Sequence, residues 1–291
     1  MWDRVTVVGC GLIGASFALA MRRAGACRRI AGWDTSPTAL DDALRLRVID
    51  EVDAAFACAS SPDGVSSSDL VYLSMPVGEI IRFLRESGWR MKPGVVLTDA
   101  GSTKEEVCRA AREGLLADRR FVGGHPVAGS HLRGLAHARA DMFENAPYVL
   151  TNVEHETSRT ALAALEATFG LFGARVHVLS AGEHDRAMAL MSHLPQLVSS
   201  LLAAVVREQP DADALNALSG SGYRDMTRLA GSSWAVWRDI LATNPAKVAA
   251  ALDAFAEKLD AVRQELRNYP AHDAPHTLDV TSSLFENPQQ T

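Results

Sequence analysis

The sequence predicts a two-domain protein in which an α/β domain with a parallel sheet is followed by an all-helical domain. A short β-branched run leads directly into a glycine-rich loop near the start of the chain, and several later apolar runs end in polar tips. Strand signals vanish after residue 180, where helical periodicity takes over. The 291 residues are enough for two domains of ordinary size. We therefore expect an α/β domain over residues 1–180 and a helical domain over residues 181–291.

The first unit of the α/β domain has the pattern of a Rossmann-type dinucleotide-binding fold. Residues 5–8 fit a buried strand, residues 12–24 fit a helix, and residues 29–34 fit the next strand. The loop after the first strand carries three glycines, which are Gly9, Gly11 and Gly14. In this fold such glycines allow a tight turn, a close approach of the backbone to the pyrophosphate, and close packing of the helix on the strand. The alternative is a glycine-rich turn with a purely structural role.

Asp34 favours NAD over NADP as the cofactor. It ends the second predicted strand, where a carboxylate accepts hydrogen bonds from the adenosine ribose hydroxyls and repels a 2′-phosphate. Ligands of open α/β sheets bind outside the carboxyl ends of the strands, so the tips of later strands are expected to contact the cofactor as well. The candidate cofactor contacts are Gly9, Gly11, Leu12, Ile13, Gly14, Asp34, Ser74, Pro76, Asp99 and Gly101.

Further apolar runs predict the rest of the sheet. Residues 70–76, 95–99 and 121–130 fit strands whose polar tips meet at one crevice. Residues 148–151 and 175–178 fit later strands of the same sheet, with a helix over residues 154–172 between them.

The second domain is expected to consist of helices with a loosely held tail. Residues 183–207 form one long apolar-periodic stretch, in which Pro195 is expected to kink the helix. Further helices are expected over residues 211–218, 228–242 and 245–266. Residues 268–291 carry several prolines and few apolar residues, a composition typical of a loose tail.

Composition and charge argue against several other classes. The net charge of −6 and the pI near 5.8 give no sign of a nucleic-acid partner or an anionic membrane. We expect no transmembrane helix and, because the chain leads straight into the first strand, no signal peptide. The four cysteines form no CxxC pair and the nine histidines show no metal-binding spacing. We therefore expect free thiols in a reducing cytoplasm and no metal site.

His125 is the candidate acid–base residue. It follows two glycines and precedes a proline at a predicted strand end, beside the nucleotide crevice. The ordinary pKa of histidine suits proton transfer near neutral pH, although a buried structural histidine is the alternative. Ser102 lies in the next polar tip and would face the same crevice, unless it or Asp99 only caps the following helix.

Arg224 and Arg228 are the candidate carboxylate ligands. They lie four residues apart, on one face of a predicted helix, and two guanidinium groups suit a carboxylate. The alternative is a solvated basic face paired with Asp225. His193 precedes Pro195, and a kink there would turn it toward the crevice, unless it is an ordinary polar position of the helix. These features together indicate an NAD-dependent oxidoreductase that acts on an anionic substrate.

Five blocks of this sequence resemble the prephenate/arogenate dehydrogenase family of tyrosine biosynthesis. They match in order and span residues 5–241. The block at residues 9–16 is shared by many dehydrogenases, whereas those at residues 124–129 and 222–228 are much more specific. The blocks are GCGLIGAS at 9–16, DAGSTK at 99–104, GHPVAG at 124–129, SHLP at 192–195, and GYRDMTR at 222–228 with WRDI at 237–240.

The resemblance implies a specific reaction and a homodimer formed through the helical domain. Prephenate is oxidised by NAD and decarboxylated to 4-hydroxyphenylpyruvate and CO2. The resemblance implies that His125 takes the proton of the ring hydroxyl as hydride leaves, and that Ser102 aligns that hydroxyl. Arg228 matches the arginine that binds the ring carboxylate, and Arg224 stands near the entrance. Further implied substrate contacts are Ser130, His131, His193 and Gln196.

Two departures from the family pattern leave the substrate open. His131 stands where many members carry an acidic or other polar residue, and Gln196 stands where many carry histidine. Both positions are implied to lie near the substrate side chain, so arogenate, which would yield tyrosine, is the alternative substrate. More distant alternatives are a β-hydroxyacid dehydrogenase or imine reductase, and a non-catalytic NAD-sensing module. Neither of these explains the blocks around His125 and Arg228.

Overall fold

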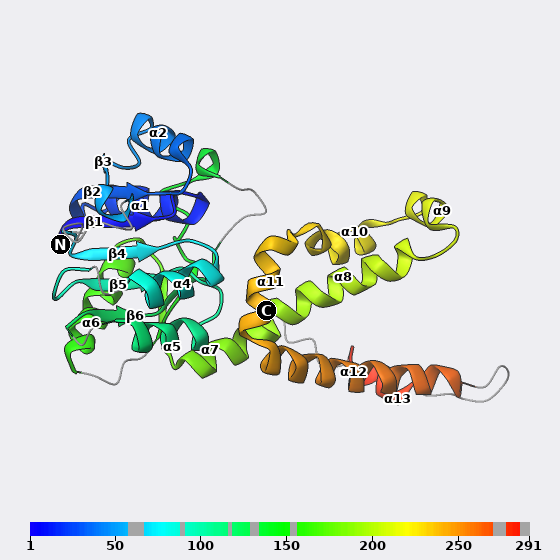
Figure 1. Ribbon diagram of the computed structural model, residues 1–291. Helices are drawn as coiled ribbons and strands as arrows, with labels where there is room; N and C mark the ends of the chain where they lie inside the picture. Colours follow the sequence, from blue (N-terminus) through cyan, green and yellow to red (C-terminus); the bar gives the residue numbers. More distant parts are fainter. Residues whose placement is uncertain are drawn as a thin grey trace.

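A six-stranded parallel sheet forms the centre of the N-terminal part of the computed structural model (Figure 1). The structure describes residues 1–57, 67–87, 91–115, 118–128, 134–151, 156–269 and 278–285. The strand order β3-β2-β1-β4-β5-β6 is that of a Rossmann fold, which confirms the predicted fold class. The strands are β1 (Trp2–Val8), β2 (Cys27–Trp33), β3 (Glu51–Val52), β4 (Leu70–Leu73), β5 (Val96–Asp99) and β6 (Arg120–Val122).

Helices cover both faces of this sheet because its strands are apolar on both sides. Tyr72 of β4 points into one core and stacks on Phe17 of α1, with ring centroids 3.8 Å apart. Its neighbour Val71 points into the opposite core with residues of α4 and α5, as the alternation of side chains along a strand requires. The helices of this part are α1 (Leu12–Arg23), α2 (Pro37–Arg45), α3 (Ala54–Ala57), α4 (Val77–Ser87), α5 (Glu105–Gly114) and α6 (Glu156–Gly170).

A second, three-stranded sheet corrects the sequence-based expectation. The strands β7 (Gly124–Pro126), β8 (Pro147–Thr151) and β9 (Arg175–Leu179) pair in the order β7-β8-β9, with β7 and β8 antiparallel. The prediction that residues 148–151 and 175–178 join the first sheet was therefore wrong. So was the single strand predicted from residue 121, because the chain leaves the first sheet after β6. Both sheets bury apolar strands, so the period-2 pattern cannot show to which sheet a strand belongs.

Asp99 ties the two sheets together. It ends β5 with no solvent exposure, and its Oδ1 accepts a hydrogen bond of 2.9 Å from the Gly124 N–H at the start of β7. Its Oδ2 accepts one of 2.8 Å from the Gly101 N–H and forms an ion pair with Lys104, which is also fully buried. A Cβ on Gly124 would lie 2.5 Å from the Asp99 carbonyl oxygen, so glycine is required for the approach. This cluster fixes β7 against the end of β5.

The C-terminal part is helical and extends away from the sheets (Figure 1). Its helices are α7 (Ala181–Met188), η3 (Ala189–His193), α8 (Leu194–Arg207), α9 (Ala212–Ala217), α10 (Ser221–Thr227), η4 (Arg228–Gly231), α11 (Trp234–Thr243), α12 (Pro245–Arg267) and α13 (Asp279–Ser283). The segment η3 is π-helical and ends just before Pro195, so the expected interruption of the long helix is present.

Two expectations for the helical part need correction. Residues 228–242 do not form one helix, because the 3₁₀ segment η4 is separated from α11 by Ser232 and Ser233. The tail is not uniformly loose, since Glu265 of α12 accepts hydrogen bonds from the N–H groups of Val280 and Thr281, both 2.8 Å, and thereby holds α13.

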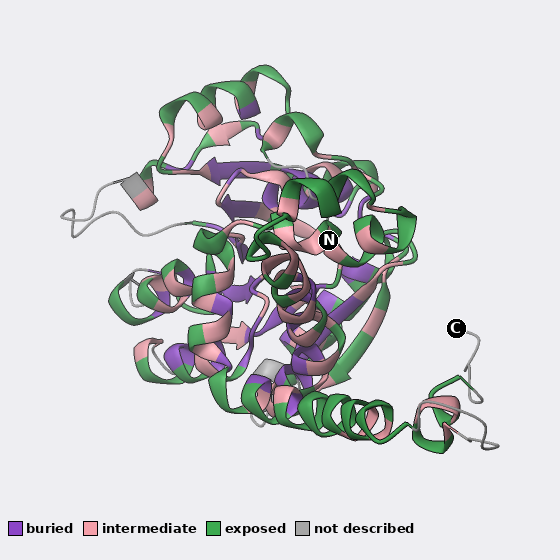
Figure 2. Ribbon diagram, turned by 90° about the vertical axis from the view of Figure 1, so that its right-hand side faces the viewer, coloured by how far each residue is buried: buried purple, intermediate pink, exposed green. Residues whose placement is uncertain are grey.

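The helix α8 is apolar and largely unburied. Among its residues only Gln196 and Ser199 are buried, while Leu201 and Val205 are more than half exposed. The helical part as a whole shows far more exposed surface than the strands (Figure 2). By length and composition alone, Ala181–Arg207 is long and apolar enough to cross a membrane, but a single helix of this kind does not by itself indicate a membrane span.

Replacement of Lys104 by methionine should destabilise the fold strongly. Lys104→Met leaves the buried Asp99 carboxylate without its counter-charge, a change that typically costs about 3–5 kcal/mol. Urea unfolding followed by circular dichroism measures the free energy of unfolding. Arg45→Ala is the control, because the ion pair of Arg45 with Asp42 is exposed and should contribute little. Equal stability of the two variants would show that the buried pair does not support the fold.

Candidate active site

A cleft lies at the carboxyl ends of the β strands and reaches the helical part. It consists of two cavities, of about 690 Å³ and about 1760 Å³, that share Gly11 and Ser74 in their walls. The smaller cavity is lined by the glycine loop, Asp34 and residues of α4. The larger cavity is lined by residues of both domains, including His125 and Arg228. The structure thus brings most of the predicted cofactor residues, together with Ser102, His125 and Arg228, to two adjoining cavities.

The glycine loop has the geometry expected of a nucleotide cradle. Gly9 has φ of +94°, which favours glycine, and a Cβ on Gly14 would lie 2.0 Å from the Gly9 carbonyl oxygen. A Cβ on Gly11 would instead meet nothing within 4 Å and would project beside the cavities that Gly11 lines. Open space at the second glycine, where the backbone approaches a pyrophosphate, fits a bound dinucleotide. The helix α1 then presents its N-terminus to the phosphates.

Asp34 is held in place at the mouth of the smaller cavity. Its Oδ2 accepts a hydrogen bond of 2.8 Å from the Cys10 N–H, and its Oδ1 accepts one of 2.9 Å from the Ser36 N–H. Burial, followed by the charge of Asp34, raises the pKa of the Cys10 thiol to about 12. Cys10 is therefore a small buried residue of the turn, and the fixed carboxylate beside it can accept hydrogen bonds from ribose hydroxyls.

The other predicted cofactor contacts divide into two groups. Ser74 and Pro76 line the smaller cavity, and Leu12 and Ile13 line the larger one. Asp99 and Gly101 are buried and are not among the residues that line the cleft. Asp99 instead anchors the loop that carries Ser102, which does line the larger cavity.

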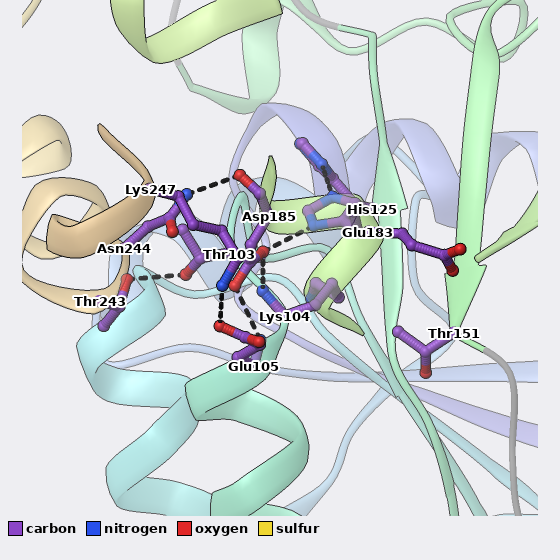
Figure 3. Close-up of polar contacts among 12 residues, drawn as sticks. Thr103, Lys104, Glu105, His125, Thr151, Glu183, Asp185, Thr243, Asn244 and Lys247 are labelled. Atoms are coloured by element: carbon purple, nitrogen blue, oxygen red, sulfur yellow. Dashed lines mark hydrogen bonds and ion pairs between the residues drawn. The ribbon is translucent and has the colours of Figure 1, made fainter. Parts of the chain in front are cut away.

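His125 lies on β7 and is linked to two residues that the sequence analysis did not identify. Its Nδ1 is 2.8 Å from Nε2 of His184, and Nδ1 of His184 is 2.7 Å from Oδ1 of Asp185 (Figure 3). Both His184 and Asp185 have no solvent exposure. Burial, reinforced by His184, Lys104 and His193, holds the pKa of His125 well below its ordinary value. His125 is therefore neutral near pH 7, the form that accepts a proton.

The adjacent His184 and Asp185 carried only a weak signal in the sequence. A histidine–aspartate pair at the start of the long helix is visible there, but α7 packs against the first turn of α5 only in the folded chain. In the structure the carboxylate of Asp185 accepts hydrogen bonds from the N–H groups of Lys104, at 2.7 Å, and Glu105, at 2.9 Å (Figure 3).

The remaining predicted substrate residues have different positions. Arg228 lines the larger cavity, whereas Arg224 is exposed, donates to the Ser219 carbonyl oxygen at 2.7 Å, and does not line it. His193 is 1% exposed and packs edge-on against Trp237, and burial lowers its pKa to about 4. Ser192 lines the cavity instead. Ser130 and His131 lie outside the described residues.

Gln196 lines the larger cavity, but its amide is already engaged. Its Nε2 donates to the Leu229 carbonyl oxygen at 2.7 Å, and its Oε1 accepts a hydrogen bond of 3.0 Å from the Ser232 hydroxyl. Both partners adjoin the segment that carries Arg228. Gln196 therefore holds this segment on α8. Over the described ranges, no three His, Cys, Asp or Glu side chains are grouped to hold a metal ion.

The site combines an open glycine cradle in a Rossmann-type domain with a neutral histidine and with an arginine from a helical domain. These features define the class of protein as a nucleotide-dependent dehydrogenase of an acidic substrate. Comparison with known families gives the same class. Residues 17–178 match the family model of the prephenate dehydrogenase nucleotide-binding domain, and residues 180–278 match that of the prephenate dehydrogenase dimerization domain.

Individual relatives agree with the family models. Prephenate dehydrogenase of Bacillus subtilis is 36% identical over 270 residues, which cover 90% of this chain and 70% of the relative. The crystal structure of prephenate dehydrogenase from A. aeolicus, in complex with hydroxyphenyl propionate and NAD+, has a TM-score of 0.85 and 27% identity, over 98% and 95% of the two chains. Synechocystis arogenate dehydrogenase has a TM-score of 0.77 and 27% identity, over 97% and 96%. The chain belongs to the prephenate dehydrogenase family, as its sequence blocks predicted.

Two glycine substitutions in the loop should have opposite effects. Gly11→Ala places a methyl group in open space, so stability should be unchanged, but NAD affinity should fall by about tenfold or more, equivalent to at least about 1.4 kcal/mol. Gly14→Ala, the matched control, forces α1 away from the Gly9 carbonyl and should lower stability by about 1–3 kcal/mol. Calorimetric titration with NAD and urea unfolding give the two quantities. Wild-type affinity in Gly11→Ala would contradict the assignment of the cradle.

Proposed function

We propose that this protein catalyses the NAD-dependent oxidative decarboxylation of prephenate to 4-hydroxyphenylpyruvate and CO2, a step of tyrosine biosynthesis. The observation that carries the proposal is the larger cavity, where His125 of the α/β domain and Arg228 of the helical domain line one space beside the glycine loop. Membership of the prephenate dehydrogenase family supports the same reaction.

The described side chains supply binding, orientation and proton removal. Arg228 pairs with the ring carboxylate, and Ser102 orients the ring hydroxyl. His125, with Nδ1 engaged by His184, has Nε2 available to take the hydroxyl proton. NAD, when bound, supplies the hydride acceptor. Aromatisation of the ring drives the loss of CO2, so positioning and proton removal are the main tasks of the protein.

The charge of the cavity favours prephenate over arogenate. None of the described residues that line the larger cavity is an Asp or Glu, while Arg139 and Arg228 both line it. Prephenate and arogenate both carry two carboxylates, but arogenate also carries an ammonium group, which needs an acceptor. The substrate contacts that we propose, besides Arg228, are Arg224 at the entrance, Ser130, His131, His193 and Gln196.

We also propose that the protein is a cytoplasmic homodimer. The apolar residues on α8, together with the dimerization-domain match over residues 180–278, support association through residues 181–266. The division into domains at residue 180 agrees with Ser180 as the N-cap of α7. We propose no nucleic-acid or membrane partner, since the net charge is −6 and the exposed helix face is explained by the dimer.

The purified protein, incubated with NAD and prephenate, should produce NADH and 4-hydroxyphenylpyruvate. Absorbance of NADH gives kcat/KM, and chromatography identifies the product. Parallel incubations with arogenate and with NADP should show lower kcat/KM, because the cavity offers no carboxylate to an ammonium group and Asp34 repels a 2′-phosphate. A β-hydroxyacid serves as the control substrate. Faster turnover of arogenate would reassign the substrate, and no NADH from any of these substrates would refute the proposal.

Replacement of Arg228 should weaken substrate binding without affecting the cofactor. Arg228→Ala should raise the KM for prephenate by about 10–150-fold, the equivalent of a hydrogen bond to a charged group worth about 1.5–3 kcal/mol. Arg228→Lys should recover only part of this, since an ammonium cannot reproduce the bidentate fork. Steady-state kinetics measure both KM values, and the KM for NAD is the internal control. A prephenate KM within twofold of wild type in Arg228→Ala would exclude this arginine as the carboxylate ligand.

A further inference from the structure

Three side chains, two of them fully buried, form a line that begins at the active-site cavity and ends inside the protein. His125 lines the cavity, His184 lies 2.8 Å behind it, and Asp185 lies 2.7 Å from the far nitrogen of His184 (Figure 3). His184 and Asp185 are absent from the described wall of the cleft. They can therefore act on the reaction only through His125.

The hydrogen bonds of Asp185 determine which nitrogen carries hydrogen in each ring. Its two oxygens accept bonds from the N–H groups of Lys104 and Glu105, as an ionised carboxylate does. Hydrogen bonds from His184 and from these two N–H groups lower the pKa of Asp185, although burial alone would raise it. Nδ1 of His184 must then be a donor, so its Nε2 is an acceptor.

The same argument determines which ring nitrogen of His125 carries hydrogen. Because Nε2 of His184 accepts, Nδ1 of His125 must donate across the 2.8 Å contact. The remaining nitrogen of a neutral His125, Nε2, carries a lone pair. This is the form that a general base needs.

We propose that His184 and Asp185 are positioning residues that form a proton relay with His125, an inference that rests on the proposed function. The O–H bond of the substrate hydroxyl breaks and an N–H bond forms at His125 Nε2. The Nδ1–H bond of His125 breaks and an N–H bond forms at His184 Nε2. Two protons have each moved across one hydrogen bond, which amounts to the net transfer of one proton to the histidine pair. No electrons are exchanged in this step, and the positive charge lies on His184 beside ionised Asp185.

The surrounding charges favour protonation of His184 over protonation of His125. Lys104 and His193 both disfavour a positive charge on His125. Lys104 also lowers the pKa of His184. The hydrogen bond and charge of Asp185 and the charge of Asp99, however, raise that pKa and so favour a positive charge on His184. Burial lowers the pKa of both rings. Asn244 of the helical domain holds the Asp185 backbone with a 2.8 Å hydrogen bond.

The variant His184→Gln distinguishes a proton relay through His184 from a purely structural contact that holds the His125 ring in place. A glutamine amide can donate to Asp185 and accept from His125, but it cannot take a proton. We expect kcat to fall by about 10²-fold, within the range of general-base contributions, with KM values nearly unchanged. The acid limb of the kcat profile should shift, because it then reports the protonation of His125 alone and no longer that of the coupled pair. His177→Gln, on exposed β9, is the matched control.

Wild-type kcat with an unmoved acid limb in His184→Gln would overturn the relay and leave His184 a purely structural role. If wild-type enzyme does not oxidise prephenate, the proposed function fails instead, so the two failures are distinguishable.

Nitrogen-15 NMR of histidine-labelled wild-type protein tests the relay without substrate, NAD or any variant. At neutral pH both His125 and His184 should carry hydrogen on Nδ1 alone. On acidification His184 should become doubly protonated as the single hydrogen of His125 moves from Nδ1 to Nε2. Double protonation of His125 while His184 stays neutral, or hydrogen on Nε2 of His125 already at neutral pH, would refute the proposal.

Discussion

Asp99 is a carboxylate without access to solvent, and the geometry of the active site depends on how it is neutralised. A buried charge is stable only if it is paired and hydrogen-bonded. Lys104 supplies the counter-charge, and the N–H groups of Gly101 and Gly124 supply the hydrogen bonds. These partners belong to the loop that carries Ser102 and to the strand that carries His125. The neutralisation of one side chain thus sets the positions of both proposed catalytic residues.

A second buried carboxylate, Asp185, docks the helical part on the α/β part. It binds the first turn of α5, close to Lys104, and thereby brings α7 against the sheet. Two further contacts at the same junction are drawn in Figure 3, namely Thr103 with Thr243 at 2.7 Å and Glu105 with Lys247. A third is the hydrogen bond of 3.1 Å from the Gly78 N–H to Asp239. The larger cavity is lined by residues of both the α/β part and the helical part. The proposed substrate site therefore exists only when this junction holds the two parts together.

The helical part has buried polar groups at its end near the sheets and exposed apolar residues farther out. Near the sheets, α7 and η3 place polar groups such as His184 and His193 in buried positions. Farther out, α8 exposes Leu201 and Val205, and α12 buries only Val248 and Ala251. An apolar surface of this kind is satisfied by a second copy of the chain, in agreement with the dimerization domain of the family. The inner end of α8 thus lines the larger cavity, whereas its outer end would serve the proposed dimer.

Features that depend on short stretches of chain could be predicted from the amino-acid sequence. The loop from Gly9 to Gly14 could be recognised because its turn and its close helix–strand contact allow only glycine at two of the three positions. The strand–helix alternation, the boundary near residue 180 and the long helices follow from local periodicity, and the family blocks singled out His125 and Arg228.

Only the tertiary structure decided which distant residues meet. Residues 148–151 and 175–178 have the pattern of strands, but their place in a second sheet depends on the turn that Gly124 makes against Asp99. Arg228 and Arg224 are alike in sequence, yet only Arg228 lines the cavity. His125 and His184 are 59 positions apart, and their contact exists because Asp185 binds the first turn of α5. Local periodicity carries no information on such contacts, because burial and the pairing of buried charges arise only when separate segments pack.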